Sequence, residues 1–277
     1  MKITDLNGTV RLNNGVEMPY MGLGVFKSNE GNEVINAVTY ALNAGYRHID
    51  TAAVYQNEKG VGIAVNNHPA GRKNVFITSK VWNSDQGYDS TIRAFDRSLD
   101  LLNTNYLDLY LVHWPVKGKY KETYRALETL YNEGRVKAIG VSNFLVHHLD
   151  DLLQSAKIVP MVNQFEFHPY LVQPDLLAMC FNNGIQPEAW SPLMQGRIFN
   201  VKEMHALANK YNKTIAQITL RWDIQKGVIT IPKSINQQRI ILNADIFDFE
   251  LSDEDMLLID HLDMHTRVGA DPDNFNF

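Results

Sequence analysis

The stretch 107-LDLYLVHWP-115 is apolar from Leu107 to Val112 except for Asp108, and it ends in a histidine, a tryptophan and a proline. Such a run is typical of a parallel strand that is buried on both faces. Seven further short runs, rich in β-branched and aromatic residues, recur at 20–25, 46–51, 75–81, 136–141, 161–167, 185–190 and 228–231. Longer amphipathic stretches follow most of these runs, so the sequence predicts parallel strands that alternate with helices.

The helices are predicted near 31–44, 88–102, 121–133, 147–155, 173–183, 201–226, 236–243 and 252–262. The long segment 201–226 is expected to break near Asn212, and no helix is predicted between the second and third strands. In the last segment, Ser252 is the expected N-cap and Asp255 follows three residues later, which approximates a capping box.

Eight such units in 277 residues match one (β/α)8 TIM barrel, which typically needs about 250 residues. Before the first barrel strand, 9–12 and 16–18 flank Asn14-Gly15, a pattern typical of a tight β-hairpin that could close the bottom of the barrel. A doubly wound open sheet uses the same units and is the alternative, but the eightfold count favours the barrel. Because no linker rich in Pro, Gly or Ser interrupts the chain, residues 1–277 are interpreted as one domain.

Composition narrows the possible partners and the compartment. The net charge of −5 argues against nucleic acid, which requires a concentrated basic face. Cys180 is the single cysteine, which excludes an intrachain disulfide and suits a reducing compartment. No apolar run approaches the 18 residues of a membrane helix, and residues 1–8 lack the apolar core of a signal peptide, so a cytoplasmic protein without membrane contact is expected.

Polar residues at the strand ends are the candidate catalytic groups, because the active site of a β/α barrel forms there. Asp50, Lys80 and His113 each follow a run apolar enough to be buried, where an unpaired charge would cost several kcal/mol. We therefore expect Asp50 to pair with Lys80, and Lys80 to lower the pKa of Tyr55 below its usual value of about 10. His113 could then donate a hydrogen bond to a carbonyl oxygen. Any one of these residues alone would be better explained as an ordinary buried polar group.

Seven stretches together resemble the successive signatures of the aldo-keto reductase family, and they occur in the family's order along almost the whole chain. They are HIDTAAVYQNE (48–58), ITSKVW (77–82), LDLYLVHWP (107–115), KAIGVSNF (137–144), NQFEFHP (163–169), AWSPL (189–193) and ITIPKS (229–234). The resemblance implies NADPH-dependent reduction of a carbonyl group, with Asp50, Tyr55, Lys80 and His113 as the catalytic tetrad.

No strand is followed by a G-x-G-x-x-G motif, and the glycines of 22–24 and 60–62 are interpreted as barrel-turn and helix-packing glycines. A phosphate site is predicted instead at 231–234 and Arg239, where a strand end leads into a helix N-terminus, and it suits the 2′-phosphate of NADP. In the family, the carboxamide-holding positions correspond to Ser142, Asn143 and Gln164, and Trp190 would stack on the nicotinamide. Leu242 stands where many members have Glu. The full set of implied NADPH-binding residues is Gly24, Val25, Asp50, Ser142, Asn143, Gln164, Trp190, Ser191, Leu193, Gln195, Ile231, Lys233, Ser234, Arg239 and Asn243.

The loop at 116–120 is short, and the segment 267–277 resembles that of bacterial members that reduce small aldehydes and dicarbonyls such as glyoxal, methylglyoxal or diketogluconate. These features predict an open, permissive substrate site. Its expected lining residues are Phe26, Trp82, His113 and Trp114, with the 267–277 segment as a further candidate. The resemblance also implies a monomer.

No metal site is predicted. His261 and His265, at helical spacing, and the pair His147-His148 are interpreted as residues of solvated helix faces. Two other function classes remain open at this point. One is a barrel hydrolase or isomerase, which uses similar strand-end acids and bases. The other is a cofactor-binding sensor protein of the same fold with little turnover.

Overall fold

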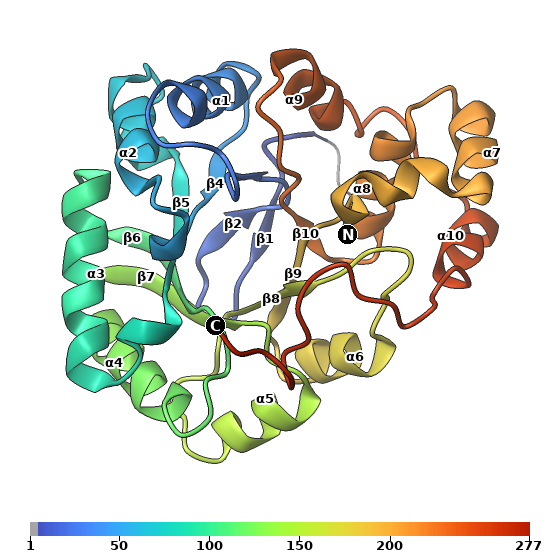
Figure 1. Cartoon of the computed structure of the whole chain (residues 1–277). Coiled ribbons are helices and arrows are strands. Elements are labelled where there is room, and N and C mark those ends of the chain that lie inside the picture. The colour runs from blue at the N-terminus through green and yellow to red at the C-terminus, as the bar shows by residue number, and fades with distance from the viewer. Residues whose placement is uncertain (1–4) are drawn as a thin grey trace.

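The computed structural model describes residues 5–277 and arranges eight parallel strands as a ring surrounded by helices (Figure 1). The strands follow one another in chain order from β3 to β10. Backbone bridges join Met21 to Thr230 and Gly24 to Lys233, so the two outer strands meet and the sheet closes. The prediction of a (β/α)8 barrel is confirmed, and the open sheet is excluded.

The barrel strands are β3 (Leu23–Gly24), β4 (His48–Asp50), β5 (Phe76–Val81), β6 (Leu107–Val112), β7 (Val136–Ser142), β8 (Val162–Glu166), β9 (Gln186–Trp190) and β10 (Ile229–Thr230). The helices are α1 (Asn32–Asn43), α2 (Glu58–Asn67), α3 (Tyr88–Leu102), α4 (Tyr120–Asn132), α5 (Val146–Leu153), α6 (Pro174–Asn182), α7 (Lys202–Tyr211), α8 (Ile215–Gln225), α9 (Gln237–Ala244) and α10 (Asp253–Asp260). Short 3-10 helices lie at Ala53–Tyr55, Arg72–Asn74, Asn83–Asp85 and Met194–Asn200.

Helix α2 was not predicted, because its sequence contains Gly60 and Gly62, and glycine lowers helix stability by about 1 kcal/mol relative to alanine. Both glycines allow close helix packing. A Cβ atom on Gly60 would lie 2.4 Å from Cγ1 of Val34 in α1, and one on Gly62 would lie 2.4 Å from the backbone oxygen of Leu102 in α3. Tertiary packing therefore outweighs local propensity here, and the interpretation of these residues as helix-packing glycines is confirmed.

The predicted break near Asn212 is confirmed, since Asn212 adopts a left-handed conformation between α7 and α8. The predicted cap at Ser252 is also present, with its hydroxyl accepting a hydrogen bond from the backbone N–H of Asp255. However, α10 ends at Asp260, so His261 and His265 do not share a helix face; both side chains are exposed, as expected, but the helical part of that interpretation was wrong. No helix within 5–277 has both the length and the apolar character needed to cross a bilayer.

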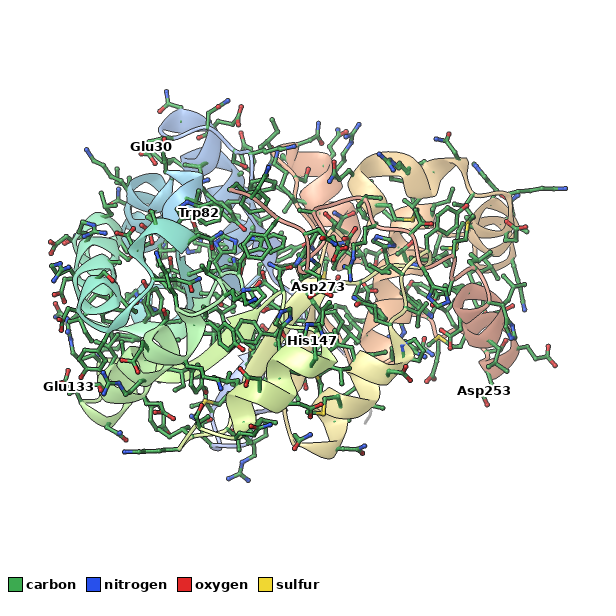
Figure 2. The ribbon with its side chains drawn as sticks, turned by 60° about the horizontal axis from the view of Figure 1, so that its bottom comes forward. Glu30, Trp82, Glu133, His147, Asp253 and Asp273 are labelled. Atoms are coloured by element: carbon green, nitrogen blue, oxygen red, sulfur yellow. The ribbon has the colours of Figure 1, made fainter. Side chains whose placement is uncertain are left out.

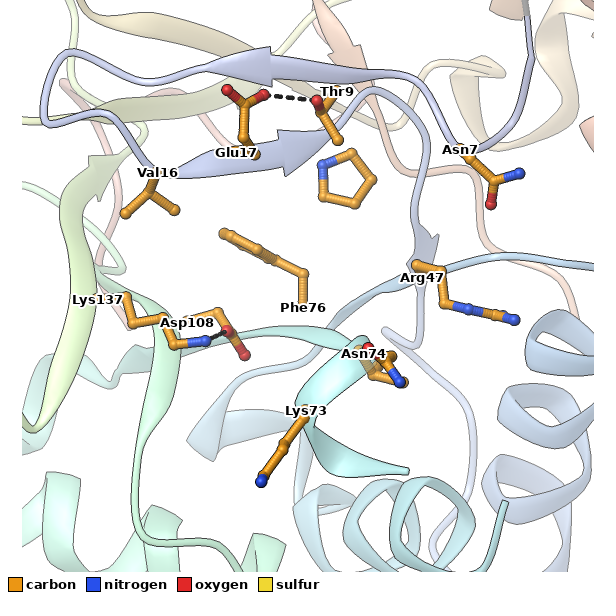
Figure 3. Close-up of a pocket in the computed structure, with 12 residues that line it drawn as sticks. Asn7, Thr9, Val16, Glu17, Arg47, Lys73, Asn74, Phe76, Asp108 and Lys137 are labelled. Atoms are coloured by element: carbon orange, nitrogen blue, oxygen red, sulfur yellow. Dashed lines mark hydrogen bonds and ion pairs between the residues drawn. The ribbon is translucent and has the colours of Figure 1, made fainter. Parts of the chain in front are cut away.

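The predicted hairpin consists of β1 (Thr9–Arg11) and β2 (Glu17–Pro19), which pair antiparallel. Side-chain amides of Asn13 and Asn14 donate to backbone oxygens of Pro160 and Lys137, near the starts of β8 and β7. The hairpin therefore covers the bottom of the barrel, as predicted. A cavity of about 350 Å³ lies between it and the barrel (Figure 3). Its carboxylates are already bonded, Glu17 to Thr9 and Asp108 to both Arg72 and Lys137.

Candidate active site

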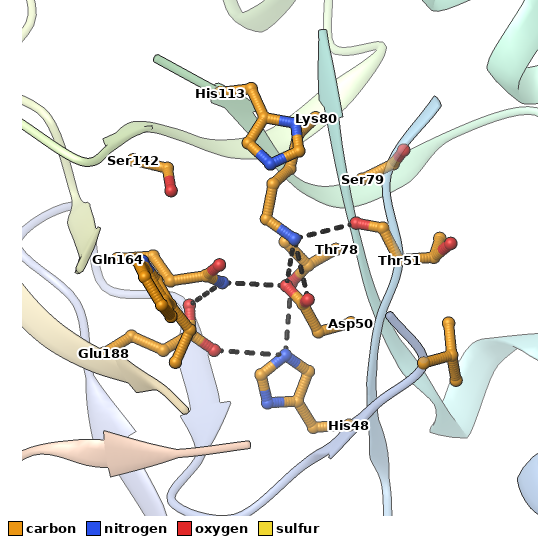
Figure 4. A network of polar contacts seen from close by, with 12 residues as sticks. His48, Asp50, Thr51, Thr78, Ser79, Lys80, His113, Ser142, Gln164 and Glu188 are labelled. Atoms are coloured by element: carbon orange, nitrogen blue, oxygen red, sulfur yellow. Dashed lines mark hydrogen bonds and ion pairs between the residues drawn. The ribbon is translucent and has the colours of Figure 1, made fainter. Parts of the chain in front are cut away.

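The polar strand-end residues meet at the opposite end of the barrel. Asp50 ends β4, Lys80 lies near the end of β5, and His113 directly follows β6. The ammonium of Lys80 donates to both carboxylate oxygens of Asp50, at 2.7 and 2.8 Å, and to the backbone oxygen of Thr51 at 2.9 Å (Figure 4). Both side chains are buried, so the expected pairing of Asp50 with Lys80 is confirmed.

Tyr55 lies in the short 3-10 helix after β4, and the Lys80 nitrogen is 5.1 Å from the centre of its ring. Burial raises the pKa of Tyr55, whereas the charge of Lys80 and a hydrogen bond with it lower that pKa. The net shift is upward, so the expectation of a pKa below the usual value was wrong. The reason is that burial of the phenol outweighs the effect of the Lys80 charge, and the negative charge of Asp50 raises the pKa of Tyr55 further.

His113 lies beside Tyr55, with 5.8 Å between the ring centres. Burial, together with the charge of Lys80, holds the pKa of His113 well below its usual range, so the imidazole is neutral near pH 7. Its Nδ1 atom is buried and makes no hydrogen bond with a described residue, while its backbone oxygen accepts one from Asn143. A neutral imidazole has one N–H donor, which is what the proposed bond to a carbonyl oxygen requires.

Three polar groups beside this cluster leave a specific set of hydrogen-bonding atoms free. Asn143 donates both amide hydrogens, to His113 and to Ser142, and its oxygen accepts from the indole nitrogen of Trp190 at 2.8 Å. Gln164 donates both amide hydrogens, to Asp50 and Glu188, and its oxygen has no partner within 5–277. One hydroxyl hydrogen of Ser142 and acceptor sites on Asn143 and Gln164 therefore remain for a ligand.

Glu188 and His48 are part of the same polar network, and neither was assigned a role from the sequence. Both are buried inside the barrel, two residues before Trp190 and Asp50 respectively, and so point to the same inner face as those residues. The sequence did indicate that Glu188 takes part in such a network, because a glutamate inside a predicted buried strand needs a partner. Residues 185–190 were interpreted only by their overall apolar character.

The predicted phosphate segment follows β10 and leads into α9. Ser234 accepts a hydrogen bond from the backbone N–H of Asn236, whose side chain caps the backbone N–H of Arg239. The side chains of Lys233 and Arg239 are exposed, and neither forms an ion pair with another described residue. Two cations thus lie at a helix N-terminus, where backbone N–H groups and the helix dipole also favour an anion.

The other predicted cofactor residues lie around these two groups. Ile231 is buried, and a Cβ atom on Gly24 would lie 2.8 Å from its backbone oxygen, so only glycine permits this approach. Val25 donates its backbone N–H to the backbone oxygen of Asp50. The side-chain amide of Gln195 donates a hydrogen bond to the backbone oxygen of Val268. Ser191 and Leu193 are partly buried after β9, and Asn243 is buried on α9.

The aromatic residues expected to line the substrate site are less exposed to solvent than the short 116–120 loop predicted. Phe26 is 51% exposed and Trp82 is partly exposed, but Trp114 is buried. The ring of Phe277 lies parallel to that of Trp82, with 5.8 Å between centres, and edge-on to that of Trp114 at 5.1 Å. Phe275 also contacts Trp114. In Figure 1 the last residues run in front of the ring of strands and end near β7 and β8, and their ring contacts narrow the expected open site.

His147 and His148, at the start of α5, face Asp273 of this segment, and Figure 2 shows His147 next to Asp273. Their Nε2 atoms lie 2.9 and 3.5 Å from one Asp273 oxygen. The interpretation as a purely solvated helix face was therefore wrong for this pair. Because Nδ1 of neutral His148 accepts the backbone N–H of Leu145, its proton is on Nε2, the nitrogen that faces Asp273.

Comparison with known proteins agrees with this geometry. The model of the Aldo/keto reductase family matches residues 7–264. The chain belongs to the aldo/keto reductase family. It is 59% identical over 274 residues to the glyoxal reductase of Bacillus subtilis (strain 168), with 99% of each chain covered. It is 45% identical to the methylglyoxal reductase DkgA of Escherichia coli (strain K12), with 96% of this chain and 97% of the other covered.

The chain is also similar to a solved structure, that of the D53A mutant of Gox0644 in complex with NADPH. It has a TM-score of 0.93 and 42% sequence identity, and the match covers 97% of this chain and 98% of that chain. The structural similarity therefore includes the strand ends of this aldo/keto reductase that carry the predicted site residues.

Proposed function

We propose that the chain is an NADPH-dependent carbonyl reductase that converts small aldehydes, ketones and dicarbonyls to alcohols, with Tyr55 as the general acid. The observation that carries the proposal is the convergence of Tyr55, the Asp50–Lys80 pair and neutral His113 at one end of the barrel. The substrate class is supported by two relatives that are named glyoxal reductase and methylglyoxal reductase.

The residues present fit NADPH. A primary carboxamide has one acceptor and two donor hydrogens, which is the complement of the free groups on Ser142, Asn143 and Gln164. The partly exposed indole of Trp190 offers an aromatic face beside them. Lys233 and Arg239 would bind the 2′-phosphate, assisted by the N-terminus of α9.

Further contacts of the same cofactor would come from the residues that surround these groups. Asn243 would contact the adenine, but Leu242, which is 47% exposed, offers no carboxylate there. The remaining residues proposed to line the cofactor are Gly24, Val25, Asp50, Ser191, Leu193, Gln195, Ile231 and Ser234.

NADPH, when bound, supplies the hydride. His113 donates its N–H to the substrate oxygen and so holds that oxygen near the hydroxyl of Tyr55. As negative charge develops on the oxygen, Tyr55 gives up its proton to it, and the ammonium of Lys80 stabilises the phenolate that remains. Asp50 keeps Lys80 charged and in place. The raised pKa of Tyr55 keeps the phenol protonated over the neutral range, so the acid is available in the free enzyme.

The mouth of the site favours compact substrates. Phe26, Trp82 and Trp114 would line it together with His113, and the rings of Phe275 and Phe277 cover Trp114. A short dicarbonyl fits between such rings, whereas a bulky fused-ring ketone would have to displace the 270–277 segment. Good reduction of steroids together with rejection of methylglyoxal would contradict this assignment.

We further propose that residues 1–277 act as one barrel domain and as a cytoplasmic monomer. The family match spans 7–264, and the single cysteine suits a reducing compartment. Sedimentation equilibrium at micromolar protein concentration tests the oligomeric state, and the mass of a dimer would contradict the proposal.

The function is tested by following NADPH oxidation at its absorbance maximum with glyoxal, methylglyoxal and larger carbonyls, with the Tyr55→Phe variant alongside. We expect turnover of the small dicarbonyls, and a loss in the variant of about 10²–10⁴-fold, the usual contribution of a general acid. Quenching of tryptophan fluorescence by NADPH should be unchanged in the variant. An undiminished rate would remove Tyr55 as the acid, and NADPH binding without turnover in the unmodified protein would instead indicate a sensor.

A further inference from the structure

Glu188 is a buried carboxyl group with no assigned part in the reaction. It lies on β9 in register with Gln164 on β8, and its Oε2 atom accepts a hydrogen bond of 2.9 Å from the amide nitrogen of Gln164. The same nitrogen donates its other hydrogen to Asp50 at 2.8 Å. Both hydrogens of this amide are therefore held by carboxyl groups inside the barrel (Figure 4).

We propose that Glu188 is a positioning residue that fixes the amide of Gln164 so that its oxygen faces the cofactor. An amide group is planar, so holding the nitrogen at two points determines where the oxygen points. If Glu188 were absent, the nitrogen would keep only Asp50 as a partner, and the amide could rotate and present a donor where the carboxamide needs an acceptor. The inference rests on the proposed function, because it assumes that Gln164 contacts NADPH.

The charge balance of the network explains why a glutamate can occupy this position. Asp50, Glu188, Tyr55, Lys80 and His48 are the titratable groups that face one another here, and Lys80 is the one permanent cation among them. Burial, and then the charge of Asp50, raise the pKa of Glu188 to about 8. Glu188 is thus mostly protonated at pH 7, and its carbonyl oxygen can still accept from Gln164.

His48 lies next to Oε1 of Glu188, the carboxyl oxygen that does not bond Gln164. Its Nε2 atom lies 3.6 Å from Oε1 of Glu188 and 3.1 Å from the hydroxyl of Thr78. Burial, assisted by the charge of Lys80, lowers the pKa of His48 to about 3. The contact between His48 and Glu188 is therefore one between two neutral groups, and it leaves Oε2 of Glu188 free to serve Gln164.

The test compares NADPH dissociation constants, measured by tryptophan fluorescence, for Glu188→Gln, Glu188→Leu, Gln164→Leu and the double leucine variant. We expect Glu188→Gln to bind within about twofold of the unmodified protein, since its amide oxygen accepts the same bond. Glu188→Leu should bind about tenfold more weakly, the effect expected for one well-placed hydrogen bond. In the Gln164→Leu background, the Glu188→Leu change should have no further effect, because the residue acts through Gln164.

Additive losses in the double variant, or unchanged binding in Glu188→Leu, would overturn the proposal. The matched control is Glu58→Leu, which removes a buried carboxylate bonded to Ser79 and should leave NADPH binding unchanged. Thermal unfolding without NADPH shows whether each variant folds. If the unmodified protein neither binds nor oxidises NADPH, the proposed function itself fails, whereas normal turnover with an unaffected Glu188→Leu variant refutes only the positioning role.

Discussion

Lys80 and Asp50 form a bidentate ion pair, with 2.7 and 2.8 Å between the ammonium and the two carboxylate oxygens, at a place where the Lys80 side chain is fully shielded from solvent. Lysine rarely occupies such a position unless it is paired. The pair therefore couples the stability of the barrel to the proposed chemistry, since Lys80 also faces Tyr55.

Replacing Lys80 with methionine should lower the free energy of unfolding by about 3–5 kcal/mol, because Asp50 is then left buried without its counter-charge. Urea denaturation followed by circular dichroism measures this. Adding Asp50→Asn to Lys80→Met should recover most of the loss, since both charges are then gone. A double variant as unstable as the single one would show that the effect is one of packing alone.

The raised pKa of Glu188 predicts a pH dependence of stability. An unfolded glutamate titrates near 4.5, so between about 4.5 and about 8 the folded state binds more protons and the free energy of unfolding falls as pH rises. The lowered pKa of His48 acts in the opposite sense, but only between about 3 and 6.5. Denaturant melts between pH 6.5 and 8 should therefore show a decline that is reduced in Glu188→Gln. Equal slopes in both proteins would contradict a titrating Glu188.

Arg239→Ala and Lys233→Met should each weaken NADPH binding about tenfold and leave NADH binding nearly unchanged, because only NADPH carries the 2′-phosphate. Dissociation constants for both cofactors, measured at a fixed ionic strength, provide the comparison. Lys202→Met, at the start of α7, is the control for loss of an exposed cation. Equal losses for the two cofactors would place the phosphate elsewhere.

Asp273→Ala should free the 270–277 segment from His147 and His148. The contacts are largely solvent-exposed, so stability should change by less than about 1 kcal/mol. Trp82 and Trp114 should nevertheless become more accessible, which acrylamide quenching of their fluorescence detects, and larger carbonyls should be accepted. Glu133→Gln, an exposed carboxylate after α4, is the control. Unchanged quenching would mean that the phenylalanines hold the segment without Asp273.

The strand pattern and the ends of the strands were predictable from the sequence, because period and composition are local properties. The apolar composition of runs such as 107–112 indicates that they are buried. The polar residues that follow these runs lie at the same end of the barrel. The pairing of Lys80 with Asp50 followed from the cost of burying either alone. The predicted hairpin at Asn14-Gly15 was equally local, since its turn needs a residue with positive φ, and Gly15 has φ of 88°.

The features that the sequence did not reveal depend on contacts between distant segments. Helix α2 requires Val34 and Leu102 to accept its glycines, and these two partner residues lie outside 58–67. The raised pKa of Tyr55 comes first from burial of its phenol, which depends on how distant segments pack around it. The placement of Phe277 over Trp82, and of Asp273 against His147, joins residues more than 120 positions apart.

The join between β3 and β10 is the thinnest part of the wall, because these strands span only Leu23–Gly24 and Ile229–Thr230 and meet through isolated bridges. Opening of the ring under heat or denaturant should begin there, and backbone amides of Gly22 and Gly24 should exchange with deuterium early. Gly24 lies on one side of this join and Lys233 on the other. A dinucleotide bound by both would therefore stabilise the join against opening. The lifetime of this enzyme in storage would then increase with the fraction of molecules that have the coenzyme bound.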